Sequence, residues 1–202
     1  ALDRLVEIGR VDGQTYTPLQ YNNYDANGNL AGRYFGDVGV EFVHNPRNQV
    51  TEARNTRGTA RYDVYYTYDV NNNLTDIEDA GGRVKYTYDK ANRLTFQSGP
   101  RDGMSATFEY DDADRRTVTR HPSGFTVRAG YDSSGRQTSL AGTRSNGTKL
   151  IDRTYRWTNG TADTALLQSE TREGTTLAYR YDARNRLLGQ GSSTYTLDQA
   201  SN

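Results

Sequence analysis

Aspartates recur in this sequence in short polar segments that resemble the start of a calcium-binding loop. DANGN, from Asp25, and DVNNN, from Asp69, place oxygen-bearing side chains at alternate positions, as an EF-hand loop does. An EF-hand also needs glycine at its sixth position and glutamate at its twelfth. Leu30 and Leu74 occupy the sixth position here, and no glutamate stands at the twelfth. The pattern therefore favours aspartates that cap turns, and we expect no bound metal or other cofactor.

Catalytic side chains are scarce in the chain. The only histidines are His44, which occupies the tyrosine position of a degenerate repeat, and His121, which sits beside Pro122 in a glycine turn, so both have structural explanations. No motif pairs either of them with a nucleophile, and the zinc-protease signature is missing. We therefore predict that the protein is not an enzyme and has no catalytic residues.

Charge and composition exclude several other classes of protein. The 25 basic residues balance 25 acidic ones, so nothing in the bulk charge attracts nucleic acid, which is not an expected partner. No apolar run approaches the ~20 residues of a membrane span. Cysteine is absent, which excludes disulfides and thiolate metal sites. The 16 tyrosines predict a folded protein whose thin core is built from amphipathic rings.

Aromatic side chains offer a second kind of chemistry, the binding of sugars. Exposed rings flanked by Asn, Asp and Arg are typical of carbohydrate-binding surfaces, and the chain has one tryptophan, Trp157. The segment WTNGTADTALL, which follows Tyr155, is the longest departure from the pattern of its surroundings. Tyr155 and Trp157 are therefore the candidate contact loop. The alternatives are a surface insertion without a function and tyrosines that face the core of a sheet.

A repeated motif organises the positions of these residues. KYTYDKANRL at 85–94, AYRYDARNRL at 178–187 and YYTYDVNNNL at 65–74 are nearly the same segment. Degenerate copies start at His44 and at Tyr155, and the eight starts are separated by 20 to 26 residues. Such a period predicts one supersecondary unit per repeat. The structural motif consists of the pairs Tyr24–Asp25, Tyr68–Asp69, Tyr88–Asp89, Tyr110–Asp111, Tyr131–Asp132 and Tyr181–Asp182.

Each copy of the motif predicts a turn that carries its own cap. Tyr86 and Tyr88 share one face of a strand, where their rings can stack on those of the next repeat. Asp89 can accept hydrogen bonds from the following backbone N–H groups, and Leu94 starts the returning strand. Asn92 sits where a left-handed backbone is expected. The same slot holds Gly28, Asn48, Asn72, Gly135 and Asn185.

A second turn lies between successive motifs and completes a hairpin. Glycines that can supply the positive φ of a tight turn occur at Gly58, Gly82, Gly103, Gly124, Gly147 and Gly174. RVKYTY and MSATFEY alternate apolar with polar side chains, the period of half-buried strands. We therefore expect an all-β fold, an antiparallel meander of tandem hairpins that forms an extended, curved sheet.

The alternation of YDxxNRL with a glycine turn resembles the RHS family, also called YD repeats, over essentially all of 1–202. In that family, which includes bacterial polymorphic toxins, insecticidal toxin complexes and animal teneurins, the repeats form a β-sheet that winds into a hollow shell. In bacterial members the shell encloses a toxic C-terminal domain. The resemblance implies a non-catalytic segment of such a shell, which encapsulates or presents a toxin or effector domain. A carbohydrate- or cell-surface-binding module is the alternative, since YD repeats are associated with carbohydrate binding.

The resemblance also implies partners and a location. The expected partners are the remaining repeats and the cargo domain of the parent chain, with carbohydrate as the alternative partner, and the expected location is secreted or at the cell surface. Family members often release their cargo at an Asp-Pro site. The four prolines here follow Thr17, Asn45, Gly99 and His121, so that site is not expected in this segment.

Both ends of the sequence predict a truncated array. The first residues, ALDRLVEIG, match the tail of the motif, and the last, YTLDQASN, match its beginning. We therefore expect a single array of about eight repeats over 1–202, cut within a motif at both ends. Its end strands would present unpaired backbone groups and could associate with another copy of the chain.

Overall fold

A computed structural model describes residues 4–101, 103–159 and 162–196 of the chain. These residues form twenty strands and no helix, so the described part offers no helix that could cross a membrane. The chain divides into two compact units, residues 1–104 and residues 105–202. The single array over 1–202 stays a prediction, as do the partial motifs at its ends, because residues 1–3 and 197–202 lie outside the described residues.

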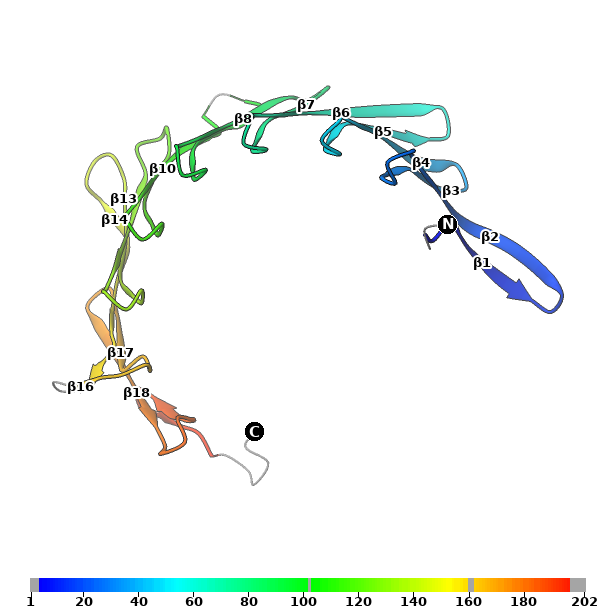
Figure 1. The fold of residues 1–202 in the computed structure, drawn as a ribbon. Helices are drawn as coiled ribbons and strands as arrows, with labels where there is room; N and C mark the ends of the chain where they lie inside the picture. Colours follow the sequence, from blue (N-terminus) through cyan, green and yellow to red (C-terminus); the bar gives the residue numbers. More distant parts are fainter. Residues whose placement is uncertain (1–3, 102, 160–161, 197–202) are drawn as a thin grey trace. The chain divides into compact units, whose positions relative to one another are not determined.

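Unit 1 is an antiparallel meander in which strands that are neighbours in sequence are neighbours in the sheet (Figure 1). The strands follow one another through short turns, as two-strand repeats require. They are β1 (Glu7–Asp12), β2 (Thr15–Tyr24), β3 (Leu30–Phe35), β4 (Val38–His44), β5 (Val50–Arg57), β6 (Ala60–Tyr68), β7 (Leu74–Asp79), β8 (Gly82–Tyr88) and β9 (Leu94–Ser98).

Unit 2 repeats this arrangement with one interruption. A two-stranded ribbon, β15 paired with β16, is inserted between β14 and β17, which are themselves paired. Both units therefore confirm the predicted all-β antiparallel meander of hairpins. The strands are β10 (Ser105–Tyr110), β11 (Arg116–Arg120), β12 (Thr126–Tyr131), β13 (Gln137–Thr143), β14 (Lys149–Arg156), β15 (Thr158–Asn159), β16 (Ala162–Asp163), β17 (Ser169–Arg172), β18 (Thr175–Tyr181), β19 (Leu187–Gln190) and β20 (Ser193–Thr194).

The sheet of unit 1 has two chemically different faces, because side chains alternate along each strand. On one face, Glu41 lies opposite Arg54, which lies opposite Asp63; we call this the charged face. On the other, the apolar face, Phe42, Ala53 and Val64 form the equivalent row, and Tyr66, Ile77 and Val84 form the next.

No thick core separates these faces. Among the described residues, Ala53 and Val118 are the buried hydrophobic side chains, one in each unit. The other apolar side chains of the sheet keep part of their surface exposed, as those of a single layer must. The strands are therefore held mainly by backbone pairing and by the turns between them.

Two kinds of turn join the strands. At Gly58, Gly82, Gly103 and Gly174 the backbone has the predicted positive φ, and Gly58 and Gly174 lie in two-residue hairpin turns. Gly124 and Gly147 also have positive φ, but they belong to longer loops. There His121 N–H donates to the oxygen of Phe125, and Arg144 N–H donates to that of Thr148. This is the bonding of the YD turns described next, so the expected tight hairpin is wrong at these two glycines.

Candidate functional site: the repeated YD turn

The turn at Asp89 shows how the motif is built. Asp89 N–H donates to the Arg93 carbonyl at 3.0 Å, and Asn92 N–H donates to the Asp89 carbonyl at 3.0 Å. The carboxylate Oδ1 accepts from Ala91 N–H at 2.9 Å and from Arg93 N–H at 3.0 Å. Oδ2 accepts from Nε of Arg93 at 2.7 Å. The aspartate thus satisfies the backbone donors that the turn leaves open, as a cap does.

The other motif aspartates repeat this geometry. In all six turns Oδ1 accepts from the backbone N–H four residues on, at 2.8 to 3.0 Å. The slot before that residue has positive φ, as predicted at Gly28, Asn72, Asn92, Gly135 and Asn185. Asp114 occupies the same slot with a φ of 62° and was not predicted. The remaining aspartates of the set are Asp25, Asp69, Asp111, Asp132 and Asp182.

These hydrogen bonds stabilise the charged form of each aspartate. The backbone N–H of Arg93 is the main cause that lowers the pKa of Asp89, and that of Arg186 has the same effect on the pKa of Asp182. The Asn73 amide lowers the pKa of Asp69. At Asp132 burial is the largest influence and raises the pKa, but bonds from Arg136 outweigh it. A carboxylate held in this way is a poor general acid at neutral pH, which suits a cap rather than a catalyst.

The hydroxyls of the motif tyrosines donate hydrogen bonds to backbone carbonyls of the preceding repeat. The hydroxyl of Tyr88 donates to the carbonyl of Leu74 at 2.8 Å, and that of Tyr68 donates to the carbonyl of Val50 at 2.9 Å. The acceptor is the first residue of a strand or lies two residues before one. The same bond joins Tyr24 to Leu5, Tyr131 to Arg116 and Tyr181 to Leu167. Tyr110 lies at the equivalent end of β10.

This bonding differs from the ring stacking that we expected. The close ring pairs that the structure shows lie elsewhere, at Tyr21 with Tyr34, Phe42 with His44, and His121 with Phe125. Partial burial raises the pKa of Tyr68 and of Tyr88, so their hydroxyls stay protonated and can donate. Directional hydrogen bonds therefore tie these five repeats to the segments that precede them.

A residue to which the sequence analysis assigned no role ties several turns to the next one. It is the fifth residue of the turn, Asn or Arg in the regular motifs. The side-chain amide of Asn29 donates to Oδ1 of Asn48 at 2.8 Å, and that of Asn73 donates to Oδ1 of Asn92 at 2.8 Å. In unit 2, Arg115 donates to the carbonyl of Asp132 at 2.7 Å. The sequence does mark this position, because in the regular motifs it holds only Asn or Arg, whose side chains carry N–H donors.

The degenerate copy at His44 keeps the turn with a different cap. Asn45 replaces the aspartate, and its Oδ1 accepts from the N–H groups of Arg47 at 2.9 Å and Gln49 at 3.1 Å. Asn48 has the predicted positive φ, at 61°. His44 occupies the tyrosine position, with Nδ1 3.7 Å from Oδ2 of Asp25. His44 therefore has a structural role in the fold, as the sequence indicated.

The second degenerate copy needs a correction of its register. Nε1 of Trp157 donates to the carbonyl of Gln137 at 2.8 Å, the bond that a motif tyrosine makes elsewhere. Trp157, not Tyr155, therefore occupies the tyrosine position. Tyr155 instead lies opposite Glu170 in the pairing of β14 with β17. Six residues separate Tyr88 from Leu94, whereas ten separate Trp157 from Leu167, so the turn carries an insertion of four residues.

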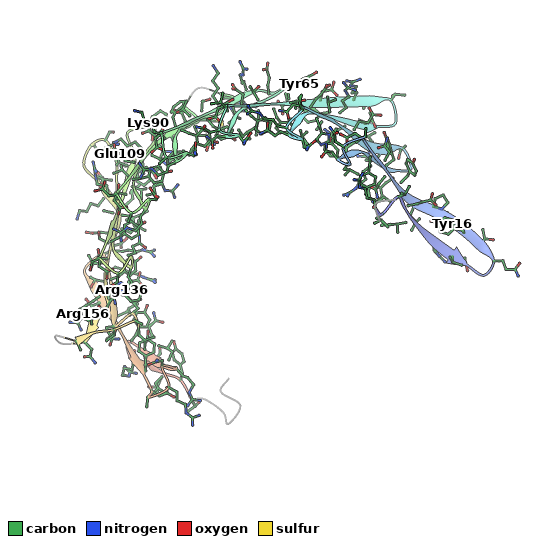
Figure 2. The ribbon with its side chains drawn as sticks, viewed as in Figure 1. Tyr16, Tyr65, Lys90, Glu109, Arg136 and Arg156 are labelled. Carbon is green, nitrogen blue, oxygen red and sulfur yellow. The ribbon has the colours of Figure 1, made fainter. Side chains whose placement is uncertain are left out.

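Arg136 holds this enlarged turn in place. Its guanidinium lies 5.5 Å from the centre of the Trp157 ring and forms ion pairs of 2.7 Å with Asp132 and with Asp163 of the insertion. It also donates to the carbonyl of Thr164. Trp157 is half-buried. Figure 2 labels Arg136 and Arg156 in this part of unit 2. Of the proposed contact loop, residues 160 and 161 lie outside the described residues.

Nothing in the described residues gathers into a metal centre. No three His, Asp or Glu side chains come together there as metal ligands. A hollow of about 830 Å³ lies beside the insertion and is lined by Asn159, Thr164, Tyr181 and Asn185 among others. A second, of about 680 Å³, lies between the turns at Asn45 and Asp69. Both open between successive turns where the repeat departs from its regular form.

Comparisons with known proteins agree with this geometry. A family model described as RHS Repeat matches residues 68–95, which span two successive YD turns. Double-stranded DNA deaminase toxin A of Burkholderia cenocepacia (strain H111) is 37% identical over 92 residues, which make up 45% of this chain and 6% of that protein.

Solved structures share the fold. A TcdB2-TccC3-Cdc42 crystal structure matches with a TM-score of 0.76, and a Tc holotoxin pore of Photorhabdus luminescens matches with 0.74. Each is 14% identical, and each match covers 93% of this chain and 11% of the solved chain. The chain thus spans a small fraction of the length of its relatives. Residues 68–95 thus match the RHS-repeat model, the same bonded turn recurs in both units, and the chain is similar in its repeats and fold to RHS-repeat, or YD-repeat, proteins.

Proposed function

We propose that this chain is a non-catalytic structural segment of an RHS-type shell, whose parent protein encapsulates or presents a C-terminal toxin or effector domain. The observation that carries the proposal is the two-way bonding of each repeat. A motif tyrosine such as Tyr88 bonds back to the preceding repeat, and an amide such as that of Asn73 bonds forward to the next turn. A unit bonded in both directions extends a sheet by simple repetition, as a wall requires.

The single layer of each unit supports the same role. In unit 1 the apolar face, with Phe42, Val64 and Ile77, remains partly exposed, because all nine strands belong to one sheet. A two-layer domain would cover such a face with a second element. In the wall of a container, this apolar face can instead point toward the enclosed contents. The family relatives are toxins by name, which supports a toxin-associated parent protein.

The proposed partners are the remaining repeats and the cargo domain of the parent chain, in a secreted or cell-surface protein. The deaminase activity in the name of the Burkholderia relative belongs to that protein, of which the matched segment is 6%. We assign no catalytic step to the present segment. The carbohydrate-binding alternative gains no support at Trp157, because its indole N–H bonds to Gln137 and its ring lies beside Arg136.

The parent reading frame tests the proposal. We expect further YD repeats on both sides of this segment and an unrelated domain after the last repeat. Trypsin digestion of the full-length protein should then leave that C-terminal domain intact under conditions that cut the isolated domain. Equal rates of cleavage would contradict encapsulation. An array that ends without any further domain would contradict a container altogether and would place the carbohydrate alternative first.

A further inference from the structure

The charged face of the first four strands carries three tyrosines in an arrangement that the YD motif does not explain. Tyr21 lies opposite Tyr34 in the pairing of β2 with β3, and Tyr16 lies on the same face of β2. Tyr16 and Tyr21 are 50% and 47% exposed, so their ring surfaces are available to a partner. Figure 2 labels Tyr16 on this first hairpin. We call Tyr16, Tyr21 and Tyr34 the tyrosine platform.

Glycines seat two of these rings flat on the sheet. Tyr34 lies across Gly32 and Gly39, where an added Cβ would come within 2.7 Å of its hydroxyl and of its Cδ1, respectively. A Cβ at Gly9 would overlap the ring of Tyr16. These glycines lie within strands, where glycine weakens pairing and usually marks a close approach. The close approach here is that of a ring whose outer surface faces away from the sheet.

Two glutamates lie beside these tyrosines. Tyr34 donates to Oε1 of Glu41 at 3.0 Å. Glu7 raises the pKa of Tyr16, chiefly as a hydrogen-bond acceptor for its hydroxyl. Tyr21 lies opposite Glu7 in the pairing of β1 with β2, and its ring centre is 6.4 Å from that of Tyr34. The platform therefore places carboxylates next to its rings, and Tyr34 is held both by the sheet below it and by Glu41.

Within the described residues, the same two glutamates form no ion pair, unlike other acids on this face. Farther along the charged face, Asp63 pairs with Arg61 at 2.8 Å, and Asp76 pairs with Arg83 at 2.9 Å. None of the side chains that β1 to β4 place on this face is basic. Arg54, opposite Glu41, is held by both carboxylate oxygens of Glu52 at 2.9 Å.

We propose that the tyrosine platform, with Glu7 and Glu41, is a docking surface for an extended protein segment that presents arginine side chains. Aromatic faces attract cations, most often guanidinium groups, which also stack flat on rings and bond carboxylates through two N–H groups. The open, flat surface suits an extended chain rather than a small ligand. The two carboxylates and the absence of basic side chains repel polyanions such as nucleic acid.

The probe for this surface is an alternating Gly-Arg peptide, measured by calorimetry with the whole chain. Gly-Gln and Gly-Lys peptides of equal length are the comparisons, and cellohexaose represents a neutral glycan. We expect the Gly-Arg peptide to bind, the Gly-Lys peptide to bind more weakly, and the Gly-Gln peptide not to bind. Y21A should weaken binding by about two- to fivefold, as loss of one exposed cation–π contact does, and E7Q combined with E41Q should have a similar effect.

The matched control is Tyr65→Ala. Tyr65, which is labelled in Figure 2, is 48% exposed on the same face, but its opposite neighbour Glu52 is paired with Arg54. Y65A should leave binding unchanged, and both exposed sites should tolerate alanine in circular dichroism. Equal weakening by Y65A and Y21A, or no binding of the Gly-Arg peptide, would overturn the proposal. Binding of cellohexaose alone, with loss in Y21A, would instead assign the surface to neutral saccharides.

Discussion

Asp89 and Tyr88 are adjacent in sequence but stabilise different parts of the fold. Every hydrogen bond of the Asp89 carboxylate stays within its own turn, whereas the Tyr88 hydroxyl bonds to Leu74 in the preceding repeat. Loss of the carboxylate therefore frees backbone donors inside one loop. Loss of the hydroxyl weakens the attachment between two repeats. The motif combines a local cap and a longer-range tie in two consecutive residues.

Replacement of Asp89 by alanine should destabilise unit 1. The N–H groups of Ala91 and Arg93 lose their acceptor, as in the loss of a cap, and we expect the melting temperature to fall by about 4–8 °C for a cooperative unit of about 100 residues. The D89N variant should lose less, because Asn45 caps the same turn in the degenerate copy with its Oδ1. Thermal unfolding followed by circular dichroism measures both, and a D89A variant as stable as D89N would contradict the cap.

Acid should destabilise the fold through the same carboxylates. The pKa of each motif aspartate is lowered in the folded chain, so the unfolded chain binds more protons at acid pH. Their stabilisation is complete above the unfolded value of about 4 and is lost as the pH falls through the folded values. Urea unfolding between neutral and acid pH should show this loss. The loss should be smaller in D89N, and an identical pH profile would contradict the assignment.

Residue type alone predicted much of the turn but not all of it. Asn92 and Gly28 were assigned to the left-handed slot because their side chains tolerate it, and the structure confirms both. The left-handed backbone at Asp114 was not predicted, because aspartate occurs at caps as readily as at left-handed positions. Trp157 was not assigned to the tyrosine position because Tyr155 matches the residue type of the motif. The position is instead defined by a hydrogen bond to Gln137, twenty residues earlier. A contact between residues so far apart in the sequence cannot be recognised from the spacing of residues within one motif.

At the scale of elements, one side chain joins the insertion in the enlarged turn of unit 2 to the regular turn at Asp132. The ribbon of β15 and β16 has only two paired residues on each strand. Such a ribbon is not stable by itself in water. Arg136 joins it to the regular turn at Asp132 through Asp163 and the Thr164 carbonyl. The neighbouring hairpins need no such support, because their strands pair over longer spans.

Replacement of Arg136 by alanine should loosen this ribbon without unfolding the sheet. The emission of Trp157 should shift to longer wavelength as the ring loses its guanidinium neighbour and gains water. Hydrogen exchange at the Thr164 amide, which bonds to the Trp157 carbonyl, should accelerate. Arg184→Ala is the control, an exposed position in the regular turn at Asp182. Unchanged emission and exchange in R136A would show that the ribbon is held by other contacts.

At the scale of the whole chain, stability should be passed from each turn to its neighbour. The Asn73 amide donates to Asn92, so N73A and N92G remove the two ends of one bond, and glycine keeps the positive φ of that slot. A double-mutant cycle should give a coupling of about 1 kcal/mol, the net worth of a typical hydrogen bond. N73A combined with R115A, which alters a turn of the other unit, should be additive within about 0.3–0.5 kcal/mol. Urea denaturation of the three single variants, the two double variants and the parent measures both cycles. Coupling in the distant pair as large as in the adjacent pair would mean that the chain unfolds as one block, whereas coupling confined to neighbours is the behaviour of a linear array, in which a local change in one repeat leaves the remainder of the wall intact.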